Sequence, residues 1–77
     1  MNYEKLEQLT SNLRIILNLI RDYNQELELL IIEYKKRFND DKKFDKILTK
    51  ISNCEAQIKF NEEQYKQTIN QINELLK

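Results

Sequence analysis

The residues of this chain that could take part in chemistry are one thiol and a few adjacent carboxylates. The 77-residue sequence has a single cysteine, Cys54, and no histidine to act as its base. Two carboxylate pairs, Glu62 with Glu63 and Asp40 with Asp41, suit a solvated or capping role better than acid–base catalysis. No metal-ligand spacing or glycine-rich phosphate loop is present. The sequence therefore predicts a non-enzymatic protein with no cofactor and no metal site.

The charge of the chain is balanced, with thirteen basic and thirteen acidic residues. Proteins that bind nucleic acid or anionic membranes usually carry a large positive excess, so neither class of partner is expected. One basic cluster could contact phosphate or an acidic protein, but cations also stabilise a helix C-terminus, and we favour that second interpretation. The cluster comprises Lys35, Lys36, Arg37, Lys42, Lys43 and Lys46.

The expected compartment follows from features at the N-terminus and from the cysteine content. The first residues, MNYEKLEQLT, lack the basic and apolar regions of a signal peptide. The longest apolar runs are Ile15–Leu17 and Leu29–Ile32, which are far too short to span a bilayer. A single cysteine cannot form an internal disulfide. These observations predict a cytoplasmic protein without a membrane span.

A regular apolar pattern predicts that the chain is all-α. There is no glycine or proline to interrupt a helix. Apolar residues recur in alternating steps of three and four, which is the heptad pattern of helices that pack along one seam. We predict a helix over residues 3–38, with Asn2 as its candidate N-cap. Its seam positions, called a and d, are Leu6, Leu9, Leu13, Ile16, Ile20, Tyr23, Leu27, Leu30 and Tyr34.

The second half of the chain continues the pattern after a break. We predict a turn over residues 39–41, where Asn39 suits a helix C-cap, and a second helix over residues 41–76. An antiparallel pairing of the two seams matches every a position with a d position and centres the turn between Asp40 and Asp41. The expected fold is one domain, 1–77, forming an antiparallel two-helix hairpin, with a single long helix as the competing arrangement. The second seam comprises Phe44, Ile47, Ile51, Cys54, Ile58, Asn61, Tyr65, Thr68, Ile72 and Leu75.

The positions that flank the seam predict an interaction surface. In an antiparallel pair the e positions of both helices share one side, and the g positions share the other. The g side is mostly polar, whereas the e side carries apolar residues near the turn and near the chain ends. A homodimer or a helix of a partner protein is expected to cover them, because so small a hairpin is marginally stable alone. This e-side patch comprises Tyr3, Leu17, Ile31, Phe38, Leu48, Ile69 and Leu76.

The segment ISNCEAQIKFNEEQY, residues 51–65, resembles the second helix of the small co-chaperones of type III secretion needle subunits. That family shows an isoleucine, a small residue, a glutamate, an isoleucine and a later tyrosine at similar spacing. Here these are Ile51, Cys54, Glu55, Ile58 and Tyr65. The chain departs from the family in lacking a glycine or proline in its connection. The resemblance implies a cytoplasmic bacterial hairpin that pairs with a helical-repeat chaperone and keeps a needle subunit monomeric.

Two other classes of function remain open. The chain could be a structural coiled-coil element that only self-associates, such as a phage scaffold protein. It could also be a small regulator of a signalling phosphoprotein, because NQELE, residues 24–28, followed by Tyr34, resembles the Ser-Gln-Glu-Leu-Asp segment of small aspartyl-phosphate phosphatases. This segment departs from that motif at its first and last residues.

Overall fold

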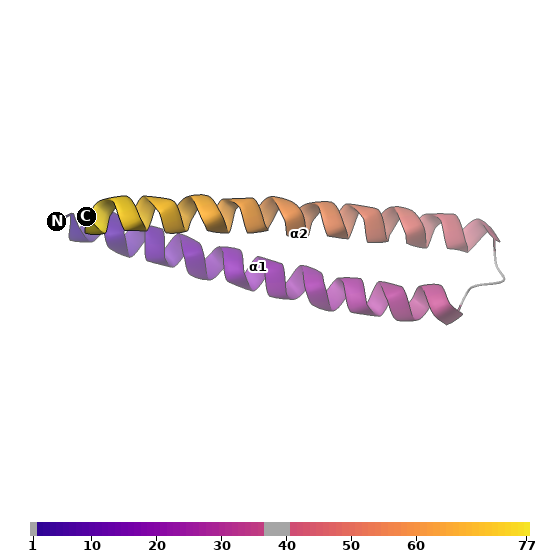
Figure 1. The fold of residues 1–77 in the computed structure, drawn as a ribbon. Helices are drawn as coiled ribbons and strands as arrows, with labels where there is room; N and C mark the ends of the chain where they lie inside the picture. Colours follow the sequence, from indigo (N-terminus) through magenta and orange to yellow (C-terminus); the bar gives the residue numbers. More distant parts are fainter. Residues whose placement is uncertain (1, 37–40) are drawn as a thin grey trace.

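The chain forms an α-helical hairpin. The computed structural model describes residues 2–36 and 41–77, and in the second range it describes side chains from residue 45 onward. Helix α1 spans Tyr3–Lys36 and helix α2 spans Asp41–Leu76. The two helices run antiparallel, with the start of α1 and the end of α2 at the same end of the molecule (Figure 1). The predicted hairpin is confirmed and the single long helix is wrong. Phe38 and residues 39–40 of the predicted turn lie outside the described residues.

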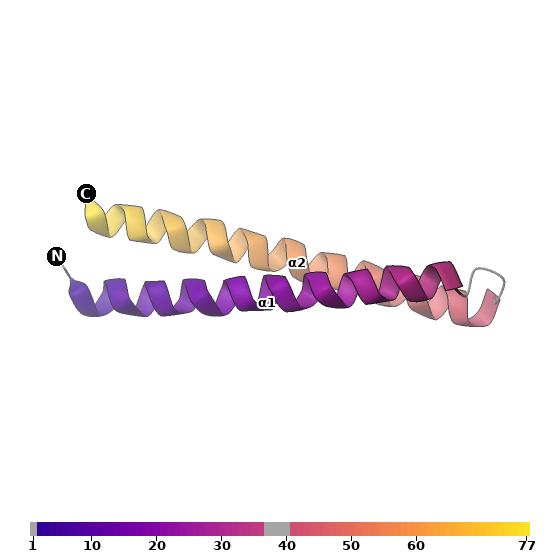
Figure 2. The same cartoon turned by 90° about the horizontal axis from the view of Figure 1, so that it is seen from below.

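The two helices cross at a shallow angle. They are farther apart at the turn end in Figure 1 and farther apart at the chain ends in Figure 2, which is a view turned by 90°. Such a crossing is typical of helices that pack through heptad seams. Among the described residues, neither helix is long and apolar enough to cross a membrane.

The hairpin is a rod with an unusually large surface. It measures 59 × 14 × 12 Å and has a radius of gyration of 17.4 Å, whereas a compact domain of this length has about 11.5 Å. Its accessible surface is 6350 Å², whereas a compact monomer of the same mass exposes about 5,000 Å². Much of the side-chain surface of each helix therefore has no partner within the chain.

The core is the predicted seam. Each seam residue whose side chain is described is buried or half-buried, and the deepest apolar ones are Leu9, Leu30, Ile47 and Cys54. Apolar side chains at a and d positions lie on the face toward the other helix, so removing them from water drives the pairing. The periodicity thus correctly predicted which face of each helix is buried.

Polar seam residues are accommodated by hydrogen bonds. Asn61 is only 6% exposed, and its Nδ2 donates to the Gln57 carbonyl oxygen at 2.8 Å. Buried Thr68 donates from Oγ1 to the Gln64 carbonyl oxygen at 2.8 Å. Both bonds return to α2 itself. Polar side chains thus replace apolar ones in two seam layers of the half of the hairpin near the chain ends.

Helix α1 begins at a well-formed cap. Asn2 Oδ1 accepts a hydrogen bond from the Lys5 backbone N–H at 3.1 Å, and the Asn2 carbonyl oxygen accepts one from the Leu6 N–H at 3.1 Å. An asparagine side chain in this position satisfies one of the free N–H groups of the first turn. Asn2 is therefore the N-cap, as predicted.

Candidate protein-interaction surface

The structure leaves the e-side patch largely open to solvent. Ile31 and Leu48 each follow a buried seam residue, Leu30 and Ile47, by one position. A step of one residue turns the helix by about 100°, so both side chains emerge from the seam onto the same flank. The exposed members of the patch are Tyr3, Leu17, Ile31, Leu48 and Leu76. Ile69 is half-buried, and Phe38 lies outside the described residues.

The patch is divided into two apolar ends by a polar middle. Ile31 and Leu48 form the end near the turn, and Tyr3, Ile69 and Leu76 form the end near the chain termini. Between them, Leu17 on α1 shares the flank with the e positions of α2 that carry Glu55 and Glu62, both exposed. A matching surface would therefore be apolar at its two ends and would carry a cation near its centre.

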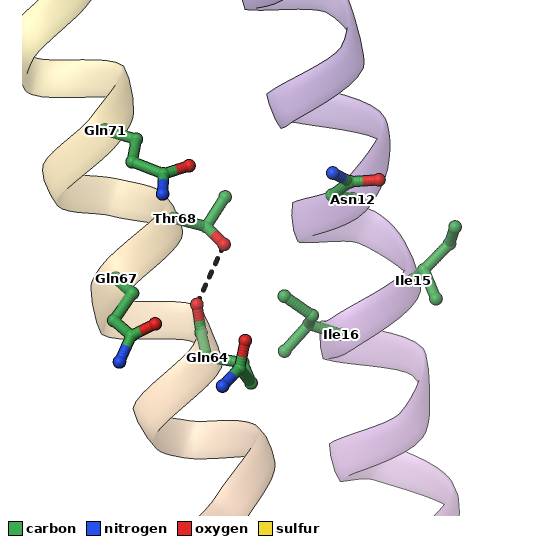
Figure 3. Close-up of a pocket in the computed structure, with 7 residues that line it drawn as sticks. All are labelled: Asn12, Ile15, Ile16, Gln64, Gln67, Thr68 and Gln71. Atoms are coloured by element: carbon green, nitrogen blue, oxygen red, sulfur yellow. Dashed lines mark hydrogen bonds between the residues drawn. The ribbon is translucent and has the colours of Figure 1, made fainter.

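The opposite flank contains a groove between the helices. Figure 3 shows Ile16 of α1 pointing toward α2, with glutamine amides along the α2 wall and Asn12 on the α1 wall. The dashed line in that view is the Thr68 to Gln64 hydrogen bond. The residues that line this groove are Asn12, Ile15, Ile16, Gln64, Gln67, Thr68 and Gln71.

A second groove on the same flank, nearer the turn, is lined in part by charged residues and by the thiol. Its lining includes Glu26, Lys50 and Cys54. The Cys54 Sγ donates to the Tyr23 carbonyl oxygen at 3.0 Å, across the helix pair. Burial and then the negative charges of Glu26 and Glu55 raise the pKa of the thiol, against an opposing effect from the Leu27 backbone. The thiol is thus kept protonated and contributes to the seam, which is not the setting of a reactive cysteine.

The hairpin register agrees with the sequence pairing. Cys54 bonds to Tyr23, and Ile16 lies across the groove from Thr68. The predicted partners, Leu27 for Cys54 and Tyr65 for Ile16, each lie within about one helical turn of these contacts.

No group of histidine, cysteine or acidic side chains within residues 2–36 and 45–77 could hold a metal ion.

Some exposed apolar residues were not included in the predicted surface. Ile15, Leu19 and Phe60 are exposed at c and g positions, on the flank opposite the e-side patch. Phe60 occupies a c position, which normally faces solvent. The sequence signal that could have indicated this surface is that the c and g neighbours of Phe60 on α2, Gln57, Gln64 and Gln67, are uncharged.

No protein-family model, curated protein or solved structure matches this chain.

Proposed function

We propose that the chain is a non-enzymatic protein-binding hairpin whose e-side patch receives an amphipathic helix of a partner protein. The observation that carries this proposal is the exposure of Ile31 and Leu48 on one flank, directly beside the buried seam. A third helix laid along this flank would contact α1 and α2 at once. Burying the apolar side chains that the hairpin leaves in water would stabilise the complex by about 25 cal/mol per Å² of apolar surface.

The division of the patch specifies the chemistry of the partner helix. Its two ends would be apolar, because they meet Ile31 with Leu48 and Tyr3 with Leu76. Its centre would carry lysine or arginine, because Glu55 and Glu62 are exposed there. Opposite charges at an interface favour one register and one partner over others.

The concrete form of the proposal is a co-chaperone of a type III secretion needle subunit, acting in the bacterial cytoplasm with a helical-repeat chaperone. The resemblance of residues 51–65 to that family supports it. Four of the matching residues, Ile51, Cys54, Ile58 and Tyr65, lie in the seam. The resemblance therefore bears on how the hairpin is built, while the partner would contact the e-side patch.

The proposal is tested by capture from native cell extract with charge substitutions. Ile31→Asp and Leu48→Asp place a carboxylate in the patch, and Ile32→Asp places one on the outer face of α1. Ile32 is the adjacent residue and is also exposed, so it is a matched control. A protein retained by the wild type and by Ile32→Asp, and lost from the two patch variants, is expected. Mass spectrometry of that protein should identify a small helical secretion subunit or its chaperone.

Two results would refute parts of this proposal. If Ile31→Asp and Leu48→Asp lose helicity in far-UV circular dichroism, these residues belong to the core and the patch is not a docking site. If all four proteins retain the same partners, binding does not use this flank. A partner of another class would leave the binding function standing and exclude the co-chaperone.

A further inference from the structure

The flank opposite the e-side patch has a segment without charge. It lies in the half of the rod near the chain ends, at the c and g positions of both helices. We call it the amide face. It is unusual because 34% of the residues in the chain are charged. Its members are Gln8, Asn12, Ile15 and Leu19 on α1, with Phe60, Gln64, Gln67 and Gln71 on α2.

The amide face has the composition of an interface centre. Ile15 is 58% exposed and Phe60 is 59% exposed. Leu19 is also exposed, and by the pairing of the helices it lies between these two residues along the length of the rod. The groove floored by Ile16 runs beside them, with glutamine amides on its wall (Figure 3). Interface cores are depleted in charged residues and enriched in aromatic ones, and they are surrounded by polar groups that can form hydrogen bonds.

We infer that the amide face binds a second copy of this chain in a two-fold symmetric dimer. In such a contact a surface meets a copy of itself, and the groups near the symmetry axis face their own kind. Glutamine and asparagine amides tolerate this, because each carries both a donor and an acceptor. An axis through the centre of the e-side patch would instead bring Glu55 and Glu62 against the same carboxylates.

The rod also exposes enough surface for one dimer contact. The surface of 6350 Å² exceeds that of a compact monomer of this mass by about 1,300 Å². A standard stable interface buries about 800 Å² per partner. Two hairpins joined through their amide faces would form a four-helix bundle of the usual kind, with the e-side patches on its outside. The dimer would therefore present two patches to partner helices.

Sedimentation equilibrium with charge substitutions on each flank tests the dimer. The wild type should be a dimer. Ile15→Glu on α1 and Phe60→Glu on α2 should raise the dimer dissociation constant about thirtyfold or more, which is the effect of losing an interface hot spot. Leu17→Glu is the matched control, since Leu17 is two residues from Ile15, is 47% exposed and lies on the other flank. It should leave the dissociation constant unchanged.

A milder variant covers the case in which these substitutions unfold the hairpin. Gln67→Glu changes an exposed amide to a carboxylate of the same shape, and it should weaken the dimer while far-UV circular dichroism is unchanged. A monomeric wild type would overturn the inference. So would a dimer that Leu17→Glu dissociates and Ile15→Glu does not, or open-ended oligomers, because a closed symmetric contact forms none.

Discussion

Replacing Asn61 by leucine should stabilise the hairpin. Asn61 is 6% exposed at a seam position, where the predicted opposing residue is Ile20. Full burial of a leucine side chain contributes about 1.5–3 kcal/mol. The substitution removes one hydrogen bond, from Nδ2 to the Gln57 carbonyl oxygen, which contributes about 0.5–1.5 kcal/mol. The net gain in the free energy of unfolding should be about 1.25 kcal/mol, or about 5–10 °C in Tm.

Leucine also has a higher helix propensity than asparagine, so the control must contain the same change of residue. Asn70 lies on the same helix and is exposed, so Asn70→Leu gains propensity without burial. Urea unfolding of both variants, followed at 222 nm and at one protein concentration, gives the burial contribution as their difference. A fixed concentration is needed because association adds to apparent stability.

The reasoning would be refuted if Asn61→Leu were no more stable than Asn70→Leu. That result would mean that the Asn61 amide contributes as much to the seam as a packed leucine. A polar seam residue can also fix the register of a coiled coil at a cost in stability. A more stable Asn61→Leu variant that forms mixed oligomers would assign that role to Asn61.

Two further predictions concern the seam. Leu30→Ala should lower the free energy of unfolding by about 2–4 kcal/mol because it removes a buried side chain, whereas Leu29→Ala, at the adjacent exposed position, should change it by less than about 0.5 kcal/mol in the same urea titration. The pKa of the Cys54 thiol is raised in the folded state, chiefly by burial, so the native protein holds that proton more tightly than the unfolded chain. Its contribution to stability is complete below about pH 8.5 and is lost as the pH rises above it. Urea midpoints from neutral pH to about pH 10 should therefore fall less for Cys54→Ala than for the wild type.

The periodicity of the sequence was sufficient to predict the core. Steps of three and four residues placed even Asn61 and Thr68 in the seam, although their side chains are polar, because position on the helix decides which face is covered. The pairing of the two seams also placed Cys54 opposite Leu27, and the thiol lies against that turn of α1, where it bonds to the Tyr23 carbonyl oxygen. The buried face and the pairing of the helices both follow from the spacing of residues along the chain, so a single sequence is enough to predict them.

The interaction surfaces were harder to predict. The apolar residues at e positions could be identified from the heptad pattern, and Ile31 and Leu48 among them are exposed. Phe60 and Leu19 lie on different helices. That they share one flank of the hairpin follows only once the two helices are paired. A polar flank was expected there, but neutral amides and charged groups behave differently toward a second copy of the same surface.

The antiparallel arrangement of the seam also determines the order in which it can form. The hydrogen bond between Cys54 and Tyr23 spans 31 residues, and the layers nearer the chain ends span more. The entropic cost of closing a loop grows only as the logarithm of its length. Once the layers near the turn have formed, each later layer therefore adds little entropic cost, and the helices pair progressively from the turn toward the chain ends. We expect the layers of Asn61 and Thr68 to close late and open early, because their side chains are polar. The amide face lies on this half of the rod, so a second copy bound there would hold closed the end of the hairpin that otherwise opens first.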